Sequence, residues 1–188
     1  MKGRVARDPD LLDAIDALAR ATFSGPAWRV VREGREPLQP SHVSGRWDMG
    51  ANDALYTSLD PDGAIAEIHF RLGQEPVFPS RFKATLYKLR LSIEDVVRFD
   101  TLDALIPLGV DAAQYHRILY DRTQQIGDAV QFLGRSGSIA PNARWSCLNL
   151  VLYDIDPNGI EIVEQTPIDW TDWRNRTAAI RRADVRKA

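Results

Sequence analysis

Arg29 and Glu67 are the first charged side chains whose surroundings suggest a ligand site. Arg29 lies in the stretch AWRVVR (residues 27–32), whose aromatic and β-branched residues predict a strand. A guanidinium on a half-buried strand must find a partner or line a cavity, and its fork of donors fits phosphate oxygens. A structural salt bridge and a ligand contact are both compatible with this position.

Glu67 belongs to the helical run AIAEIHF (residues 64–70). At about 100° per residue, Ile65, Ile68 and Leu72 form an apolar stripe, and Glu67 falls at its edge. The carboxylate can therefore reach a cleft beside the core. A solvated helix carboxylate is the plainer interpretation, and periodicity alone favours it.

Arg46 and Trp47 lie in a polar stretch, residues 33–52, that is rich in Gly, Pro and Ser. A long loop of this kind inside a compact domain is usually functional. A guanidinium beside an aromatic ring suits the phosphate and base of a dinucleotide, although the same pair occurs on ordinary surfaces. Tyr56, in the short strand ALYTS (residues 54–58), is more typical of a core ring than of a stacking platform.

The sequence gives no signal for metal or nucleophile chemistry. His42, His69 and His116 lack metal-ligand spacing and have no adjacent nucleophile motif. One cysteine, Cys147, forms no internal disulfide. No GxGxxG or GxxxxGK[ST] loop follows a strand, so the Rossmann and P-loop folds are unsupported. We expect neither a metal nor a separate cofactor.

The elements that must position these residues predict an α+β fold. Strands and helices are interspersed without regular βαβ alternation, which favours one twisted, mainly antiparallel sheet with helices packed around it. The predicted strands span residues 27–32, 54–58, 82–91, 148–153 and 160–164; the predicted helices are one capped by Asp8 or Asp10 with Leu11, Ile15 and Leu18 on its apolar face, one capped by Asp60 and stopped by Gly73, and two over residues 112–120 and 124–133.

Composition limits the protein class. A chain of 188 residues with 44% hydrophobic and 27% charged residues is typical of one soluble globular domain. Basic residues gather only near the carboxyl end, from Arg174 onward, and predict a solvated, partly disordered tail rather than a nucleic-acid site. No run approaches the roughly 20 apolar residues of a membrane span, and no signal peptide is apparent. Together with the lone cysteine, this indicates the cytoplasm.

The order of several short motifs resembles the RES-domain family over about residues 25–170. The amino-terminal half carries WRV (28–30), GRW (45–47), ALYTS (54–58) and AIAEIHF (64–70), and the carboxyl-terminal half carries QIGDA (125–129), APNAR (140–144) and NLVLY (149–153). The resemblance implies a helix over residues 1–24 that packs on the domain, the RES domain over 25–170, and a basic tail over 171–188.

The resemblance also implies an NAD+ site in an architecture similar to that of ADP-ribosyltransferases. Carried over one at a time, the catalytic residues are Glu67, Arg29 and Tyr56, and the NAD+-binding residues are Arg29, Arg46, Trp47, Tyr56 and Asn142. The two arginines would hold the pyrophosphate, Tyr56 would pack at the nicotinamide end, and Glu67 would stabilise the cation-like transition state at the ribose. Asn142 stands where the family has Ser, and its amide can still hydrogen-bond a ligand.

By the same resemblance, the chain is expected to be the toxin of a toxin–antitoxin pair that breaks the nicotinamide–ribose bond of NAD+ and depletes it. The group that accepts the ADP-ribosyl unit determines the reaction. With phosphate as acceptor the protein is an NAD+ phosphorylase, with water a glycohydrolase, and with a protein side chain a mono-ADP-ribosyltransferase. The Ser-to-Asn change leaves a third alternative, a non-catalytic domain that binds a nucleotide or a protein. The expected partner is a helix-turn-helix antitoxin protein, with room for a homo-oligomer in the complex; neither nucleic acid nor membrane is expected to bind directly.

Overall fold

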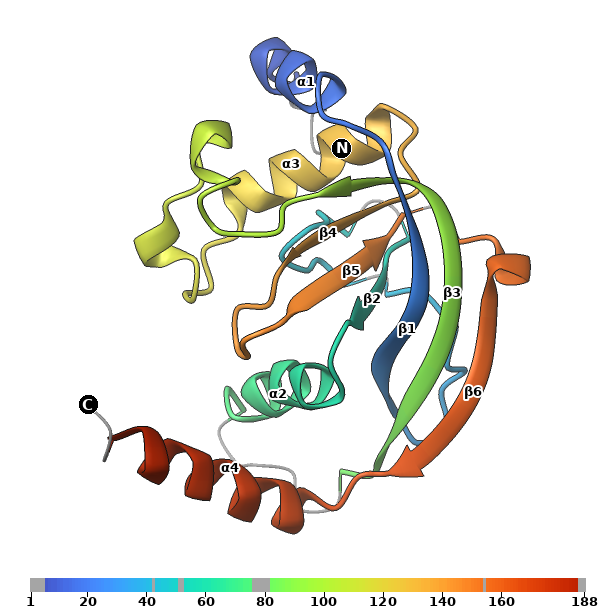
Figure 1. The fold of residues 1–188 in the computed structure, drawn as a ribbon, viewed down its shortest axis with the longest axis vertical. Helices are drawn as coiled ribbons and strands as arrows, with labels where there is room; N and C mark the ends of the chain where they lie inside the picture. Colours follow the sequence, from blue (N-terminus) through green and yellow to red (C-terminus); the bar gives the residue numbers. More distant parts are fainter. Residues whose placement is uncertain (1–5, 42, 51–52, 76–81, 154, 186–188) are drawn as a thin grey trace.

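The computed structural model describes residues 6–41, 43–50, 53–75, 82–153 and 155–185, and it has an α+β architecture (Figure 1). Its strands are β1 (Ala21–Arg32), β2 (Leu55–Ser58), β3 (Ala84–Arg98), β4 (Gly137–Pro141), β5 (Leu148–Leu152) and β6 (Ile160–Pro167). Its α-helices are α1 (Pro9–Asp16), α2 (Pro61–Leu72), α3 (Asp121–Phe132) and α4 (Trp170–Val185), and short 3₁₀ turns occur at Ile106–Leu108, Ala112–Gln114 and Pro157–Gly159.

The sheet closes on itself. Its strand order is β1-β2-β5-β4-β3-β6, and β1 also pairs with β3, so five strands form a barrel and β6 extends from β3. Only β3 and β4 run parallel; the other paired strands are antiparallel. The prediction of a mainly antiparallel α+β fold is confirmed. Closure was not predicted, because it depends on pairing between segments far apart in the chain.

Strands β1 and β3 lie side by side as a long, curved pair (Figure 1), with partners from Ala21↔Val96 to Arg32↔Ala84. Both are longer than predicted. Pro26 was expected to precede β1, yet it lies within the strand, opposite Arg90. Along most of its length β1 pairs with β3 alone, since β2 meets it at Trp28, and a strand with one free side tolerates proline.

Two of the helices begin at the caps that the sequence indicated, and α2 also ends where predicted; α1 ends at Asp16, before Leu18, which was expected on its apolar face. Asp8 caps α1 by accepting hydrogen bonds from the backbone N–H groups of Asp10 and Leu11, and α1 then packs on α3 (Figure 1). Asp60 caps α2 by accepting from the Gly63 N–H, and Gly73 ends the helix. Helix α2 packs against β1, β2 and β3, so it holds its side chains beside the barrel wall.

Two other predictions were wrong. Residues 112–120 form only the 3₁₀ turn Ala112–Gln114, because side-chain contacts to the rest of the protein hold this segment in an irregular path. The described residues of the segment that was expected to form a partly disordered tail are helical, as α4. That helix buries Trp173 against Ile65 and Ala66, and Arg176 pairs with Asp62 at 3.3 Å. Strand β4 was not predicted.

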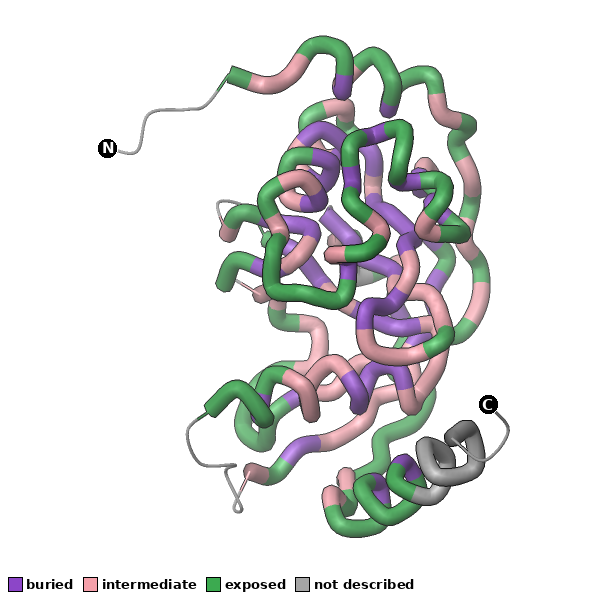
Figure 2. The backbone as a smooth tube through the Cα atoms, turned by 90° about the vertical axis from the view of Figure 1, so that its left-hand side faces the viewer, coloured by how far each residue is buried: buried purple, intermediate pink, exposed green. Residues whose placement is uncertain are grey.

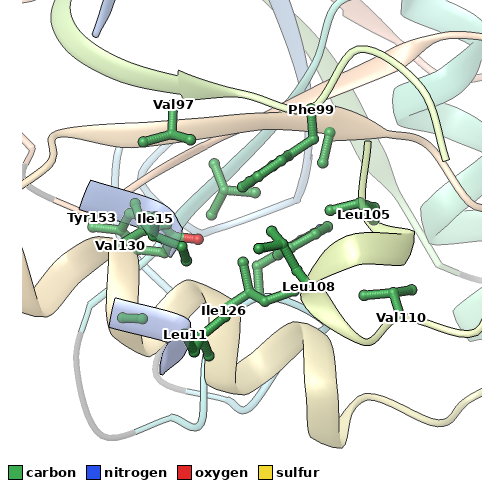
Figure 3. Packing of buried hydrophobic residues seen from close by; sticks show 14 of the residues in the cluster. Leu11, Ile15, Val97, Phe99, Leu105, Leu108, Val110, Ile126, Val130 and Tyr153 are labelled. Carbon is green, nitrogen blue, oxygen red and sulfur yellow. The ribbon is translucent and has the colours of Figure 1, made fainter. Parts of the chain in front are cut away.

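The core lies in two main clusters. One fills the barrel around Leu89, Leu91 and Leu150. The other lies where α1 and α3 cover the barrel end and includes Phe99, Leu108 and Ile126 (Figure 3). Buried segments gather in the middle of the molecule, whereas the described part of α4 is mostly exposed (Figure 2). None of the helices in the described residues is long and apolar enough to cross a membrane.

Helix α3 approaches the loop after β1 closely at Gly127. A Cβ atom at this position would overlap the backbone carbonyl of Trp47. The missing side chain lets α3 support the loop residue next to Arg46. The fold therefore couples the packing of α3 to the place of that arginine.

We expect Gly127→Ala to lower the free energy of unfolding by about 1–3 kcal/mol, because the helix and the loop must separate to admit the methyl group. Gly73→Ala is the matched control: its φ is −71°, and the nearest atoms to an added Cβ are at 3.4 Å. Urea unfolding followed by circular dichroism measures both. Equal midpoints for the two variants would contradict the close approach at Gly127.

Candidate ligand-binding site

A cavity of about 300 Å³ lies between β1, β2, α2 and the loop that follows β1. Cavities of this size accept small molecules. The cavity brings together side chains from separate parts of the sequence: Arg29, Arg46, Trp47, Tyr56 and Glu67 all line it. Asn142 does not.

Arg29 is half-buried, and its side-chain hydrogen bonds within the described residues go to backbone carbonyls. Its Nη2 donates to the Gln39 oxygen at 2.7 Å and its Nη1 to the Tyr56 oxygen at 3.4 Å, while its Nε has no partner among the described residues. Burial, and next the nearby Arg35 cation, lower the pKa of Arg29 to about 10. No described carboxylate forms an ion pair with it. A desolvated guanidinium without a counter-ion is a candidate anion-binding group.

Arg46 is held between two aromatic rings. Its guanidinium carbon lies 4.6 Å from the ring centroids of both Tyr115 and Tyr120. One Nη donates to the Arg117 carbonyl at 3.3 Å, and the other has no partner in the described part of the chain. Cation–π contacts hold the charge in place without neutralising it. Arg46 thus also presents an uncompensated cation to the cavity.

The segment that supplies these rings is tied to the barrel end. The Tyr115 hydroxyl donates to the Pro141 carbonyl at 2.6 Å. Arg144 donates to the His116 carbonyl, and its guanidinium carbon lies 3.3 Å from the ring centroid of Phe70 on α2. These contacts replace the helical hydrogen bonds that the sequence predicted here. Tyr120, at the end of this segment, lines the cavity, a role that sequence reasoning missed.

The hydroxyl of Tyr56 anchors the loop that carries Arg46. It donates to Asp48 Oδ2 at 2.5 Å and accepts from the Trp47 N–H at 3.0 Å. Burial, and then the charge of Asp48, raise the pKa of Tyr56 well above its usual value. The hydroxyl is therefore a neutral donor to Asp48. Tyr56 was predicted to be catalytic; its ring lines the cavity while its hydroxyl is engaged by the loop.

Trp47 belongs to the core. Its side chain is 1% exposed, and its ring is parallel to that of Phe99 with centroids 6.1 Å apart. The Arg46–Trp47 pair had suggested that the indole stacks on a base, but the buried indole is not free to do so. Arg46 pairs instead with Tyr115 and Tyr120.

Glu67 lies on the wall that α2 provides. Its Oε1 accepts from Asn149 Nδ2 at 3.5 Å, and Asn149, from β5, also lines the cavity. Asn142 lies behind Asn149 and donates to its Oδ1 at 2.8 Å. The residue that was expected to touch the ligand therefore touches Asn149. The NLVLY motif contained Asn149, but nothing in its spacing indicated a place beside Glu67.

The cavity carries an excess of positive charge. Five arginines and two glutamates line it: Arg29, Arg32, Arg35, Arg46 and Arg71 against Glu36 and Glu67. This balance favours an anionic ligand. Within the described residues, no group of three His, Cys, Asp or Glu side chains could hold a metal ion.

Fold and site together define an α+β protein with a cationic cavity that contains one half-buried carboxylate, Glu67. The model of the RES domain family matches residues 19–174, and the chain belongs to this family. The fold is similar to that of a chain in the crystal structure of the M. tuberculosis MbcT–MbcA toxin–antitoxin complex, with a TM-score of 0.80 and 18% identity over 90% of this chain and 98% of that chain. Among curated proteins, none matches the sequence.

Buried tyrosines around the site predict a loss of stability at alkaline pH. Burial is the first cause that raises the pKa of Tyr56, Tyr115 and Tyr153 above the usual value of 10. Above about pH 10 the unfolded chain loses these protons while the native state keeps them, so the native state binds more protons and the free energy of unfolding falls as pH rises. Thermal unfolding measured across this range checks the direction.

Tyrosinate absorbance gives the second readout. We expect the signal of these three residues to appear only as near-ultraviolet circular dichroism is lost. Tyr56→Phe should lower the free energy of unfolding at neutral pH by about 1–3 kcal/mol, because it removes one of the hydrogen-bond donors to the buried Asp48 carboxylate, and should flatten the alkaline dependence. Full ionisation of all tyrosines in the folded protein would refute the assignment.

Proposed function

We propose that this chain binds NAD+ in the cavity, breaks its nicotinamide–ribose bond, and acts in the cytoplasm as the toxin of a toxin–antitoxin pair. One observation carries the proposal: Arg29 and Arg46 present two guanidiniums without a described carboxylate partner to the cavity that also contains Glu67. A pyrophosphate group offers the oxygen pairs and negative charge that such forks bind best.

The arginines would supply binding and orientation. Arg29 is fixed by two backbone carbonyls and Arg46 by two rings, so neither needs to reorganise when the phosphates arrive. Positioning of this kind lowers the entropic cost of reaching the transition state. The ribose next to the phosphates would then lie within the same cavity as Glu67.

Glu67 would act on charge that develops during the reaction. When the C1′–N bond breaks, its electron pair moves to the pyridinium nitrogen, nicotinamide leaves as a neutral molecule, and positive charge appears on the ribosyl ring. A fixed carboxylate stabilises that charge more in the transition state than in the substrate. Water adding at C1′ gives ADP-ribose and a proton; phosphate gives a phosphorylated ADP-ribose; a protein side chain gives an ADP-ribosylated protein.

Membership in the RES family and the fold shared with a chain of a toxin–antitoxin complex support the toxin role. An architecture similar to ADP-ribosyltransferases is part of the same proposal. The partner would be a helix-turn-helix antitoxin protein, and co-expression with a neighbouring reading frame of that kind is its direct test.

Glu67→Gln tests the chemistry. We expect the wild type to consume NAD+ and release nicotinamide, and the variant to lose about 10²- to 10³-fold in kcat, because the amide keeps the shape of the carboxylate without its charge. Chromatography of nicotinamide and ADP-ribose products, with and without phosphate, names the acceptor. Glu75→Gln, at an exposed position after α2, should behave as wild type. Intact NAD+ with every acceptor would refute depletion.

Arg29→Met separates binding from stability. Because Arg29 is desolvated without a counter-ion, an apolar side chain of similar length should leave the melting temperature unchanged or raise it. Affinity for ADP-ribose should fall about 10- to 100-fold through loss of charged hydrogen bonds to phosphate. Calorimetric titration and thermal melts measure the two effects, and Arg90→Met, which removes an exposed pair with Glu161, is the control. A large drop in melting temperature with unchanged affinity would assign Arg29 to the fold.

A further inference from the structure

Asn142 is a buried side chain with four hydrogen bonds and no exposure to the cavity. Its Oδ1 accepts from the backbone N–H of Arg144 at 2.7 Å and of Trp145 at 3.0 Å. Its Nδ2 donates to the Gly63 carbonyl at 3.3 Å and to Asn149 Oδ1 at 2.8 Å. All the groups of the amide are used.

These bonds fix the direction of the amide. A backbone N–H can only donate, so the atom that faces Arg144 and Trp145 must be the oxygen of Asn142. Its NH₂ group then faces Asn149, so Asn149 must accept this hydrogen bond through its side-chain oxygen. The NH₂ group of Asn149 is thereby turned toward Glu67, where it lies 3.5 Å from Oε1.

We propose that Asn142 and Asn149 are positioning residues that act as a directed amide relay, aiming an N–H group at the Glu67 carboxylate. The inference rests on the proposed function, since it assigns to the relay the orientation of the group that would stabilise the ribosyl cation. It also gives a purpose to the Asn at position 142. A Ser hydroxyl has one proton and cannot donate to both Gly63 and Asn149.

Glu67 needs such a restraint because guanidinium groups share its surroundings. The Glu67 carboxylate interacts electrostatically with the Arg144 guanidinium, which stacks on Phe70 of the same helix. It also interacts electrostatically with the Tyr115 hydroxyl and the Cys147 thiol. Arg46 lines the cavity with Glu67. An unrestrained carboxylate would turn toward one of these guanidiniums. The N–H of Asn149 competes with them and keeps the carboxylate beside the β5 wall of the cavity.

The same amide also ties α2 to the barrel. Its bond to the Gly63 carbonyl reaches the first turn of the helix, and Gly63 packs so closely that a Cβ would overlap Cys147 Sγ and Ser58 Oγ. Asn142 therefore fixes the position of α2 on the barrel and, through Asn149, the orientation of the Glu67 carboxylate on that helix.

Asn142→Asp reverses the relay with almost no change of shape. The carboxylate still accepts from the two backbone N–H groups, but its second oxygen cannot donate, so Asn149 must turn its NH₂ inward and present its oxygen to Glu67. We expect kcat for NAD+ consumption to fall about 10- to 100-fold with KM little changed, as for a misplaced catalytic group. Asn175→Asp, exposed on α4, adds the same charge and should behave as wild type.

A double-mutant cycle tests the coupling. Asn149→Ala removes the last donor, so adding Asn142→Asp to it should cost little more in kcat than Asn149→Ala alone. Losses that simply multiply would overturn the relay. Thermal melts of each variant show whether the folded state is retained.

Side-chain amide signals in ¹⁵N NMR spectra test the relay without activity. Glu67→Ala should move the Asn149 NH₂ resonances, and Asn142→Asp should move them too, whereas Asn175→Asp should not. Asn149 NH₂ resonances that stay in place in both Glu67→Ala and Asn142→Asp would overturn the relay, even if the enzyme is active. If the wild type consumes no NAD+ with any acceptor, the proposed function fails, and the NMR result still decides whether the relay exists.

Discussion

Arg29 and Arg46 hold positive charge in a cavity where the described residues offer no carboxylate within ion-pair distance of either. Keeping a guanidinium out of water costs several kcal/mol unless other groups replace the lost hydration. Around Arg29 those groups are backbone carbonyls, and around Arg46 they are the faces of Tyr115 and Tyr120. Neither arrangement cancels the charge. The site thus retains electrostatic attraction that an ion pair within the protein would have consumed.

This arrangement requires a firmly held loop, because Arg46 comes from a stretch without regular structure. The buried Asp48 carboxylate supplies the anchor: it accepts from the Tyr56 hydroxyl and from the N–H groups of Gly45 and Gly50. The close packing of α3 at Gly127 supports the same loop from behind. Backbone groups and one carboxylate therefore do for this loop what a helix or strand does for Arg29 and Glu67.

Local signals in the sequence predicted local structure well, while tertiary contacts decided the rest. The caps Asp8 and Asp60 located two helices, since a side-chain oxygen near a helix start acts within a few residues. Barrel closure depends on pairing between distant strands, and residues 112–120 are irregular because Tyr115 bonds to a distant carbonyl. The order of the short motifs predicted that Arg29, Arg46 and Glu67 share one site, and all three line the cavity. Asp48, Tyr120 and Asn149 were missed because their roles arise from distances that no spacing encodes.

The hydrogen bonds of Asn142 show why this residue does not bind a ligand in the cavity. A ligand-contacting role would require the amide to reach the cavity, but all its hydrogen-bonding groups are already used by Gly63, Arg144, Trp145 and Asn149. Breaking any of them to reach a ligand would leave a buried polar group unpaired, at a cost of about 1–3 kcal/mol. Asn142 is thus better suited to orienting Asn149 beside Glu67 than to binding a ligand.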